Sequence, residues 1–229
     1  MARLPRLAVA GHLHLVIQRG DGAKPVFADD ADRRFYLGAL LHAARASAVA
    51  VHAYVLMDDQ VCLLVTPAEH GALGRVMQRV GRDYVAPFNL RHGTKGSLWA
   101  GRFQSTVLEP SGYLLAAIRF IEQAPVRVAL VAKAQDWPWS SAAHHVGHQA
   151  SPLITEHVAY WQLGNTPFER EARHELELQR LLPERQLTEL ENAARGGWPL
   201  GSAAFVAALG RATDRPVQPP PRGRPRRAI

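Results

Sequence analysis

Hydrophobic and polar positions in the first 125 residues follow two different periods, which predict strands and helices in a definite order. Apolar runs bounded by glycine or by polar turns predict strands over 12–20, 49–56, 61–65 and 104–108. Apolar residues three and four positions apart predict helices over 30–46, 73–90 and 111–123. This order is that of a ferredoxin-like α+β sandwich with an antiparallel sheet.

Local signals add detail to these elements. Asp29 or Asp30 is expected to cap the first helix and Ser111 the third, because short polar side chains accept hydrogen bonds from free backbone N–H groups. Pro87 should bend or end the second helix, since proline lacks an N–H group. An acidic turn over 57–60 should join the second and third strands.

The C-terminal third has helical periodicity and then loses it. Helices are expected over 154–163, 167–181 and 184–195, with a last short one over 203–211. From residue 212 onward proline and arginine dominate, so we expect a disordered basic tail. The predicted organisation is a sandwich domain over 1–150, C-terminal helices over 151–211 and a tail over 212–229.

Composition excludes several classes of protein. The chain has 229 residues, and none of its apolar runs approaches the roughly 20 residues that cross a bilayer. No continuous apolar segment of a secretory signal stands near residue 1. One cysteine allows no intramolecular disulfide. We therefore expect a cytoplasmic protein without membrane contact.

Positive charge is concentrated at the C-terminal end. Residues 211–229 hold six arginines and Asp214, which is +5 of the formal +7. A basic tail on a nearly neutral body is typical of a nucleic-acid-binding arm, although it can also serve only solubility. Residues 221–227 contain Arg-Gly-Arg-Pro, a pattern whose slim glycine suits the DNA minor groove. The tail arginines expected to bind nucleic acid are Arg222, Arg224, Arg226 and Arg227.

A glycine-rich basic loop over 91–103 is a second candidate for phosphate contacts. Trp99 and Phe103 are candidates for stacking on a base, or else for closing the core beneath the loop. Arg79 and Arg82 on the preceding helix would extend the basic surface. The expected cationic contacts of this surface are Arg79, Arg82, Arg91, Lys95 and Arg102.

Five stretches resemble the REP-associated tyrosine transposases. They are GHLHLVIQRG, DDADRRFYLGALLHAA, HAYVLM followed by LLVTP, HGTKGSLWAGRF, and APVRVALV before DWPWSS. The resemblance implies a transposase-like nuclease domain that recognises hairpin DNA of repeated palindromes. It also implies two histidines that hold a divalent metal, and a tyrosine that attacks a phosphodiester. In such a site the metal ion would polarise the phosphate and the tyrosine phenolate would attack it, which cleaves the DNA strand.

Four positions of this chain depart from that pattern. Gln60 and Cys62 stand where the family has its two histidines, Phe120 where it has the tyrosine, and Ala124 where it commonly has an asparagine. Each change removes a chemical function, so we expect a catalytically inactive protein with no catalytic residue, no metal and no cofactor. A divalent ion such as Mg²⁺ would be needed only if activity persists.

Three features leave an active enzyme open as an alternative. His12 and His14 have the spacing of a metal-binding pair and, with Cys62, would form a zinc ligand set. The adjacent Asp58 and Asp59 could hold Mg²⁺. Replacement nucleophiles would be Tyr84 and Tyr113.

The leading expectation is an inactive transposase-like protein of the nucleoid that binds hairpin or palindromic single-stranded DNA. An active single-strand transposase with relocated ligands is one alternative. An RNA-binding or scaffolding module on the same sheet is another. The residues do not decide between a monomer and a dimer.

Overall fold

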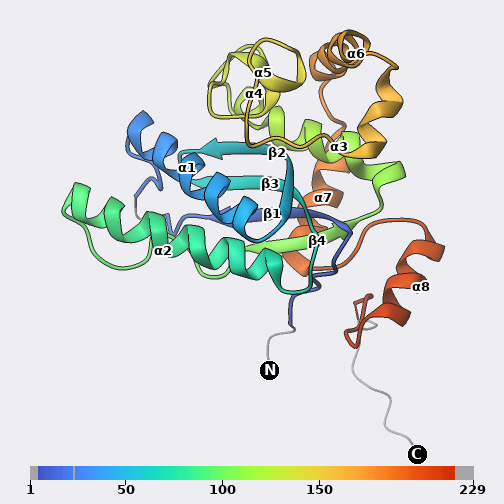
Figure 1. Cartoon of the computed structure of the whole chain (residues 1–229), viewed down its shortest axis with the longest axis horizontal. Coiled ribbons are helices and arrows are strands. Elements are labelled where there is room, and N and C mark those ends of the chain that lie inside the picture. The colour runs from blue at the N-terminus through green and yellow to red at the C-terminus, as the bar shows by residue number, and fades with distance from the viewer. Residues whose placement is uncertain (1–4, 23, 220–229) are drawn as a thin grey trace, which may run out of the picture.

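A four-stranded antiparallel sheet organises the computed structural model, which describes residues 5–22 and 24–219 (Figure 1). Its strands are β1 (Leu13–Arg19), β2 (Val49–Met57), β3 (Gln60–Pro67) and β4 (Gln104–Leu108). The spatial order β2-β3-β1-β4 places the first strand inside the sheet. The predicted α+β sandwich with an antiparallel sheet and C-terminal helices is confirmed.

Two helices cover one face of the sheet. They are α1 (Asp30–Ala46), whose N-cap Asp29 accepts a hydrogen bond from the Asp32 N–H, and α2 (Ala72–His92). Pro87 was expected to bend or end α2, and it does not end it, because the helix continues through this residue to His92. Pro87 is exposed, so water can satisfy the carbonyl that loses its helical partner. Gly93, at φ 62°, closes the helix in the left-handed conformation.

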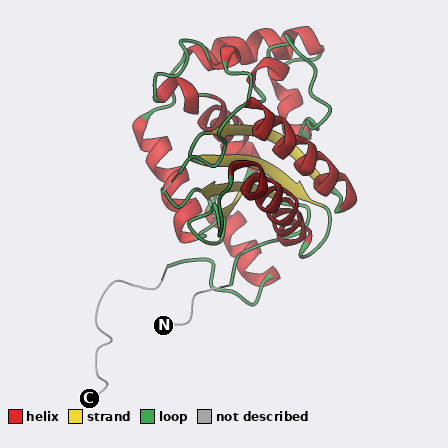
Figure 2. Ribbon diagram, turned by 90° about the vertical axis from the view of Figure 1, so that its left-hand side faces the viewer, coloured by secondary structure: helices red, strands yellow, loops and turns green. Residues whose placement is uncertain are grey.

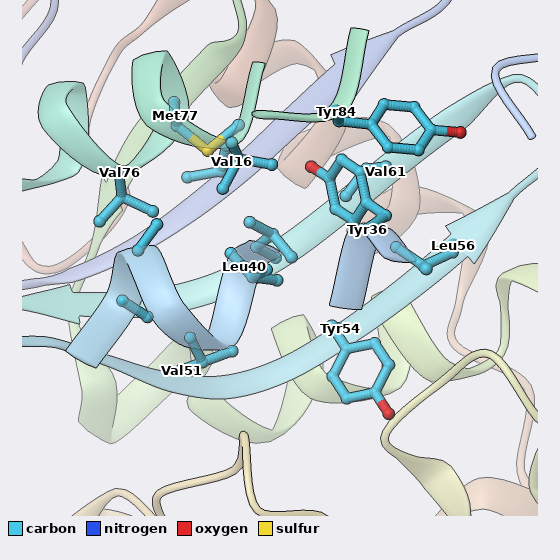
Figure 3. Packing of buried hydrophobic residues seen from close by; sticks show 14 of the residues in the cluster. Val16, Tyr36, Leu40, Val51, Tyr54, Leu56, Val61, Val76, Met77 and Tyr84 are labelled. Carbon is cyan, nitrogen blue, oxygen red and sulfur yellow. The ribbon is translucent and has the colours of Figure 1, made fainter. Parts of the chain in front are cut away.

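The core between these helices and the sheet is aromatic and branched-aliphatic (Figure 3). Tyr36 of α1 and Tyr84 of α2 are fully buried, with ring centroids 5.2 Å apart in an edge-to-face arrangement. Val16 and Val61 meet them from the sheet. Burial of each such side chain contributes about 1.5–3 kcal/mol, so this layer fixes the sheet rigidly beneath α1 and α2.

The opposite face of the sheet is also covered by helices (Figure 2). The principal ones are α3 (Pro110–Glu122), α4 (Ala124–Arg127) and α7 (Glu184–Gly196). Ser111 does not cap α3 as expected. The N-cap is Glu109 without a side-chain cap bond, and Pro110 begins the helix with its preset φ angle.

Shorter elements complete the C-terminal part. They are η1 (Ala134–Asp136), α5 (Ala142–His145), η2 (Val158–Leu163), α6 (Pro167–Gln179) and α8 (Ala203–Ala212). Tyr160 of η2 and Leu190 of α7 belong to the same hydrophobic cluster as β1 and β3. The C-terminal helices therefore share a core with the sandwich.

The two ends of the described chain lie on the same side of the sheet, beyond β4 (Figure 1). The first residues of the predicted tail contact the body there. Arg215 Nη2 donates to the Gly197 carbonyl at 2.8 Å, and Val217 packs against Leu7 and Leu209. Residues 220–229 lie outside the described part of the chain. Within the described residues, no helix is both long and apolar enough to cross a bilayer.

Candidate functional site

The face of the sheet beneath α3 gathers three of the positions at which the chain departs from the transposase pattern. Cys62 pairs directly with Ile17 across β3 and β1, and its side chain points to this face. Phe120 and Ala124 meet it in the same hydrophobic cluster. All three side chains are buried, with 2%, 5% and 4% exposure for Cys62, Phe120 and Ala124. Gln60 begins the same strand and is half-buried.

The Cys62 thiol is electrically neutral at physiological pH. Burial raises its pKa to about 12, and the nearby Arg19 and Arg127 offset that rise only in part. A thiol is a metal ligand and a nucleophile only as the thiolate. Cys62 therefore acts here as a small apolar side chain that fills the space beside Phe120.

Two arginines border this apolar patch. Arg19 Nη1 donates to Gln104 Oε1 at 2.8 Å, and its Nη2 forms an ion pair with Glu191 at 3.1 Å. The Arg127 guanidinium lies 5.1 Å from the centre of the Phe120 ring, and its Nη2 donates to the Phe120 carbonyl at 2.7 Å. The patch is thus apolar at its centre, with the Arg19–Glu191 ion pair and the Arg127 guanidinium at its edge.

The alternative zinc set of His12, His14 and Cys62 does not form, because His14 and Cys62 lie on opposite faces of the sheet. His14 pairs with Val65 and shares its face with Val16, whereas Cys62 pairs with Ile17 on the other face. The His14 Nδ1–H donates to the His12 carbonyl at 2.7 Å, and its Nε2 accepts from the Val9 N–H at 3.2 Å. Burial lowers the His14 pKa to about 4, so the ring is neutral.

The other alternative residues also have structural partners. Asp58 is exposed in the turn and forms an ion pair with Arg33. Tyr84 is buried in the α1–α2 core, where burial raises its pKa, and its hydroxyl donates to the Val26 carbonyl at 2.5 Å. The Tyr113 hydroxyl donates to Glu189 at 3.0 Å. Burial raises the pKa of both phenols, and the Glu189 carboxylate adds to the rise at Tyr113, so neither forms a phenolate nucleophile readily.

A buried ionic cluster that the sequence did not indicate lies at the end of α3. The fully buried carboxylate of Glu122 accepts hydrogen bonds from Ser141 Oγ at 2.5 Å, His145 Nδ1 at 2.6 Å and His174 Nε2 at 2.8 Å. Burial alone would raise the Glu122 pKa, but the two imidazoles outweigh it and lower the pKa. The ionised carboxylate therefore joins α5 and α6 to α3.

The same three ionisable side chains are the one group in the described chain whose potential metal-ligand atoms lie close together. The ligand atoms of Glu122, His145 and His174 are all within 4.8 Å of one another. Both carboxylate oxygens of Glu122 already accept hydrogen bonds, so we interpret the cluster as a structural contact that holds α5 and α6 against α3.

The basic side chains predicted to bind nucleic acid fall into two groups, those without an ion pair among the described residues and those that pair with an acidic residue. Arg82, Lys95 and Arg102 are exposed and make no ion pair among the described residues. Arg79 pairs with Asp83 at 3.5 Å on the same helix. Arg91 pairs with Asp29 at 2.5 Å and with Asp32 at 2.6 Å, so it holds the start of α1 against the end of α2.

The two aromatic side chains of the loop differ in burial. Trp99 is only 8% exposed and packs 6.3 Å from Tyr36, measured between ring centroids, so it closes the core beneath the loop, which is one of its two expected roles. Phe103 is half-buried and lies 3.8 Å beneath the Arg6 guanidinium. The tail arginines Arg222, Arg224, Arg226 and Arg227 lie outside the described residues.

Comparison with known proteins identifies the fold. No protein-family model matches the chain, and no curated protein matches it. A solved REP-associated tyrosine transposase bound to a REP hairpin superposes with a TM-score of 0.53 at 15% identity, over 69% of this chain and 96% of that one. The protein therefore has the fold of a REP-associated tyrosine transposase.

A second solved structure is a protein of Deinococcus radiodurans R1 described as a candidate transposase. It is 21% identical over 51% of this chain and 93% of that one, with a TM-score of 0.31. A superposition at that level adds nothing to the fold assignment.

Proposed function

We propose that the protein is a catalytically inactive, transposase-like DNA-binding protein that recognises hairpin or palindromic single-stranded DNA. The observation that carries the proposal is the packing of Cys62, Phe120 and Ala124 into one apolar cluster. The resemblance puts the second histidine, the tyrosine and the asparagine of an active enzyme at these positions.

The side chains at these positions cannot perform the family's chemistry. Phe120 has no oxygen with which to attack phosphorus. Cys62 is a buried neutral thiol, and the half-buried Gln60 offers an amide where a metal site would use imidazole. Cleavage through a phosphotyrosine would need both the missing nucleophile and the missing metal ligands.

DNA as the partner is supported by charge and by the structural neighbour. Arg82, Lys95 and Arg102 are exposed without acidic partners among the described residues, and the tail adds most of the net charge. The neighbour with the same fold was solved with a REP hairpin. We place the protein in the cytoplasm, at the nucleoid.

Binding preference tests this function. The full chain should bind a palindromic DNA hairpin about ten-fold more tightly than an unpaired strand of equal length and composition, a difference of about 1.4 kcal/mol. Fluorescence anisotropy at a fixed salt concentration measures both constants. A hairpin of the same sequence in RNA is the control, because its 2′-hydroxyls and A-form stem present a different surface. Equal affinity for all three ligands would leave only non-specific charge attraction, and tighter binding of RNA would favour an RNA-binding module.

A further inference from the structure

A pocket lined by four arginines opens at the free edge of β4. Arg6 comes from the N-terminal segment, Arg102 from the loop before β4, Arg195 from the last turn of α7 and Arg215 from the chain after α8. The cavity has a volume of about 230 Å³. It lies where the two ends of the described chain meet beyond β4 (Figure 1).

Among the described residues that line this pocket, called here the arginine pocket, none carries a carboxylate. Arg102 and Arg195 are exposed and make no hydrogen bond or ion pair with other described residues. Like charges that converge on one concave site repel one another unless an anion joins them. The arrangement therefore favours a bound anion.

Two buried polar atoms of the pocket residues have no hydrogen-bond partner in the part of the chain that the structure describes. They are the Ser105 hydroxyl oxygen, in a residue only 4% exposed, and the Arg215 Nε. A buried donor without a partner costs about 1–3 kcal/mol. Both residues line the pocket but these two atoms are shielded from it, so a bound ligand would pair first with the exposed Arg102 and Arg195.

Capping of α7 explains only part of the pocket. The last carbonyls of a helix attract cations, and Arg215 Nη2 does donate to the Gly197 carbonyl at 2.8 Å while its guanidinium lies 5.3 Å from the Trp198 ring. Arg102 and Arg195 make no such bond. Capping of α7 therefore does not account for Arg102 and Arg195, whereas a bound tetrahedral oxyanion would pair with both.

We infer that the arginine pocket binds a phosphate group of the DNA backbone. Planar guanidinium groups recognise phosphate oxygens through paired hydrogen bonds. Arg102 links the pocket to the basic loop, and Arg215 lies in the tail seven residues before Arg222. This inference rests on the proposed function, because it names one of the contacts through which DNA is held.

A DNA-free measurement tests the pocket by itself. At saturating inorganic phosphate the full chain should melt about 2–4 °C higher than in chloride of equal ionic strength. The double variant Arg102→Gln/Arg195→Gln should lose this shift. The control Arg173→Gln/Arg185→Gln removes the same charge from exposed sites on α6 and the far end of α7, and should keep it. No stabilisation of the wild type, or an equal shift in both double variants, would overturn the inference.

The DNA measurement uses the same proteins. Relative to the control pair, Arg102→Gln/Arg195→Gln should weaken hairpin binding about ten-fold and make the plot of log affinity against log salt shallower by about 1, as expected for one lost phosphate contact. If hairpins bind and the two double variants behave alike, the pocket assignment fails and the proposed function stands. If phosphate stabilises the protein but no DNA binds, the pocket is an anion site and the proposed function fails.

Discussion

Replacing Glu122 by glutamine should lower the free energy of unfolding by about 3–5 kcal/mol, the range expected when one partner of a buried ionic cluster is removed. Three donors converge on this carboxylate, from Ser141 immediately before α5, His145 of α5 and His174 of α6, and all are buried. An amide accepts through one oxygen only and turns its NH₂ group toward another donor. Urea unfolding followed by circular dichroism gives the free energy.

A matched control is Glu184→Gln in the exposed first turn of α7, which should change stability by no more than about 0.5 kcal/mol. The destabilisation should also depend on pH. The pKa of Glu122 is lower in the folded protein than its ordinary value of 4.5, so the unfolded state takes up the proton first as the pH falls. The difference between wild type and Glu122→Gln should therefore be complete above pH 4.5 and shrink below it. A difference that stays constant down to pH 3 would mean that the charge contributes nothing.

Deleting residues 220–229 should make the plot of log DNA affinity against log salt shallower by about 3–4. The deletion removes Arg222, Arg224, Arg226 and Arg227 and no acidic residue. Each arginine that neutralises a duplex phosphate releases close to one counterion, so four contacts account for a slope of about 3.6. The cut leaves Arg215 and Val217, which contact the body, in place. Affinities measured at several salt concentrations give both slopes.

A full-length control separates charge from chain length. With the same four arginines changed to glutamine, the protein should show the same shallow slope as the deletion. Parallel plots for wild type and deletion would mean that the tail stays in solvent, and that its charge serves only solubility.

The order of elements could be read from the sequence because it depends on local periodicity. The strand predicted over 104–108 has those same bounds in β4, and Asp29 caps α1 as expected from its short acceptor side chain. Pro87 does not end α2, where its exposure lets water bind the freed carbonyl. Ser111 does not cap α3, because Pro110 begins the helix and Glu109 is its N-cap.

Features that depend on distant residues could not be read in this way. His14 and Cys62 are separated by strand register, which assigns each side chain to one face of the sheet. Trp99 lies in a glycine-rich loop, where sequence does not distinguish a core aromatic from a stacking one. Glu122 is 23 and 52 positions from its two histidines. The arginine pocket draws on Arg6 and Arg215, from opposite ends of the chain.

The central claim is that the protein binds hairpin DNA without cutting it. An end-labelled palindromic hairpin incubated with the full chain and Mg²⁺ or Mn²⁺ can be resolved on native and on denaturing gels. We predict a retarded complex on the native gel. On the denaturing gel we predict only full-length strand, without a covalent protein–DNA adduct, because Phe120 supplies no nucleophile and Cys62 no metal ligand. A metal-dependent nick or adduct that disappears in Tyr113→Phe or Tyr84→Phe would contradict the claim and establish a relocated active site.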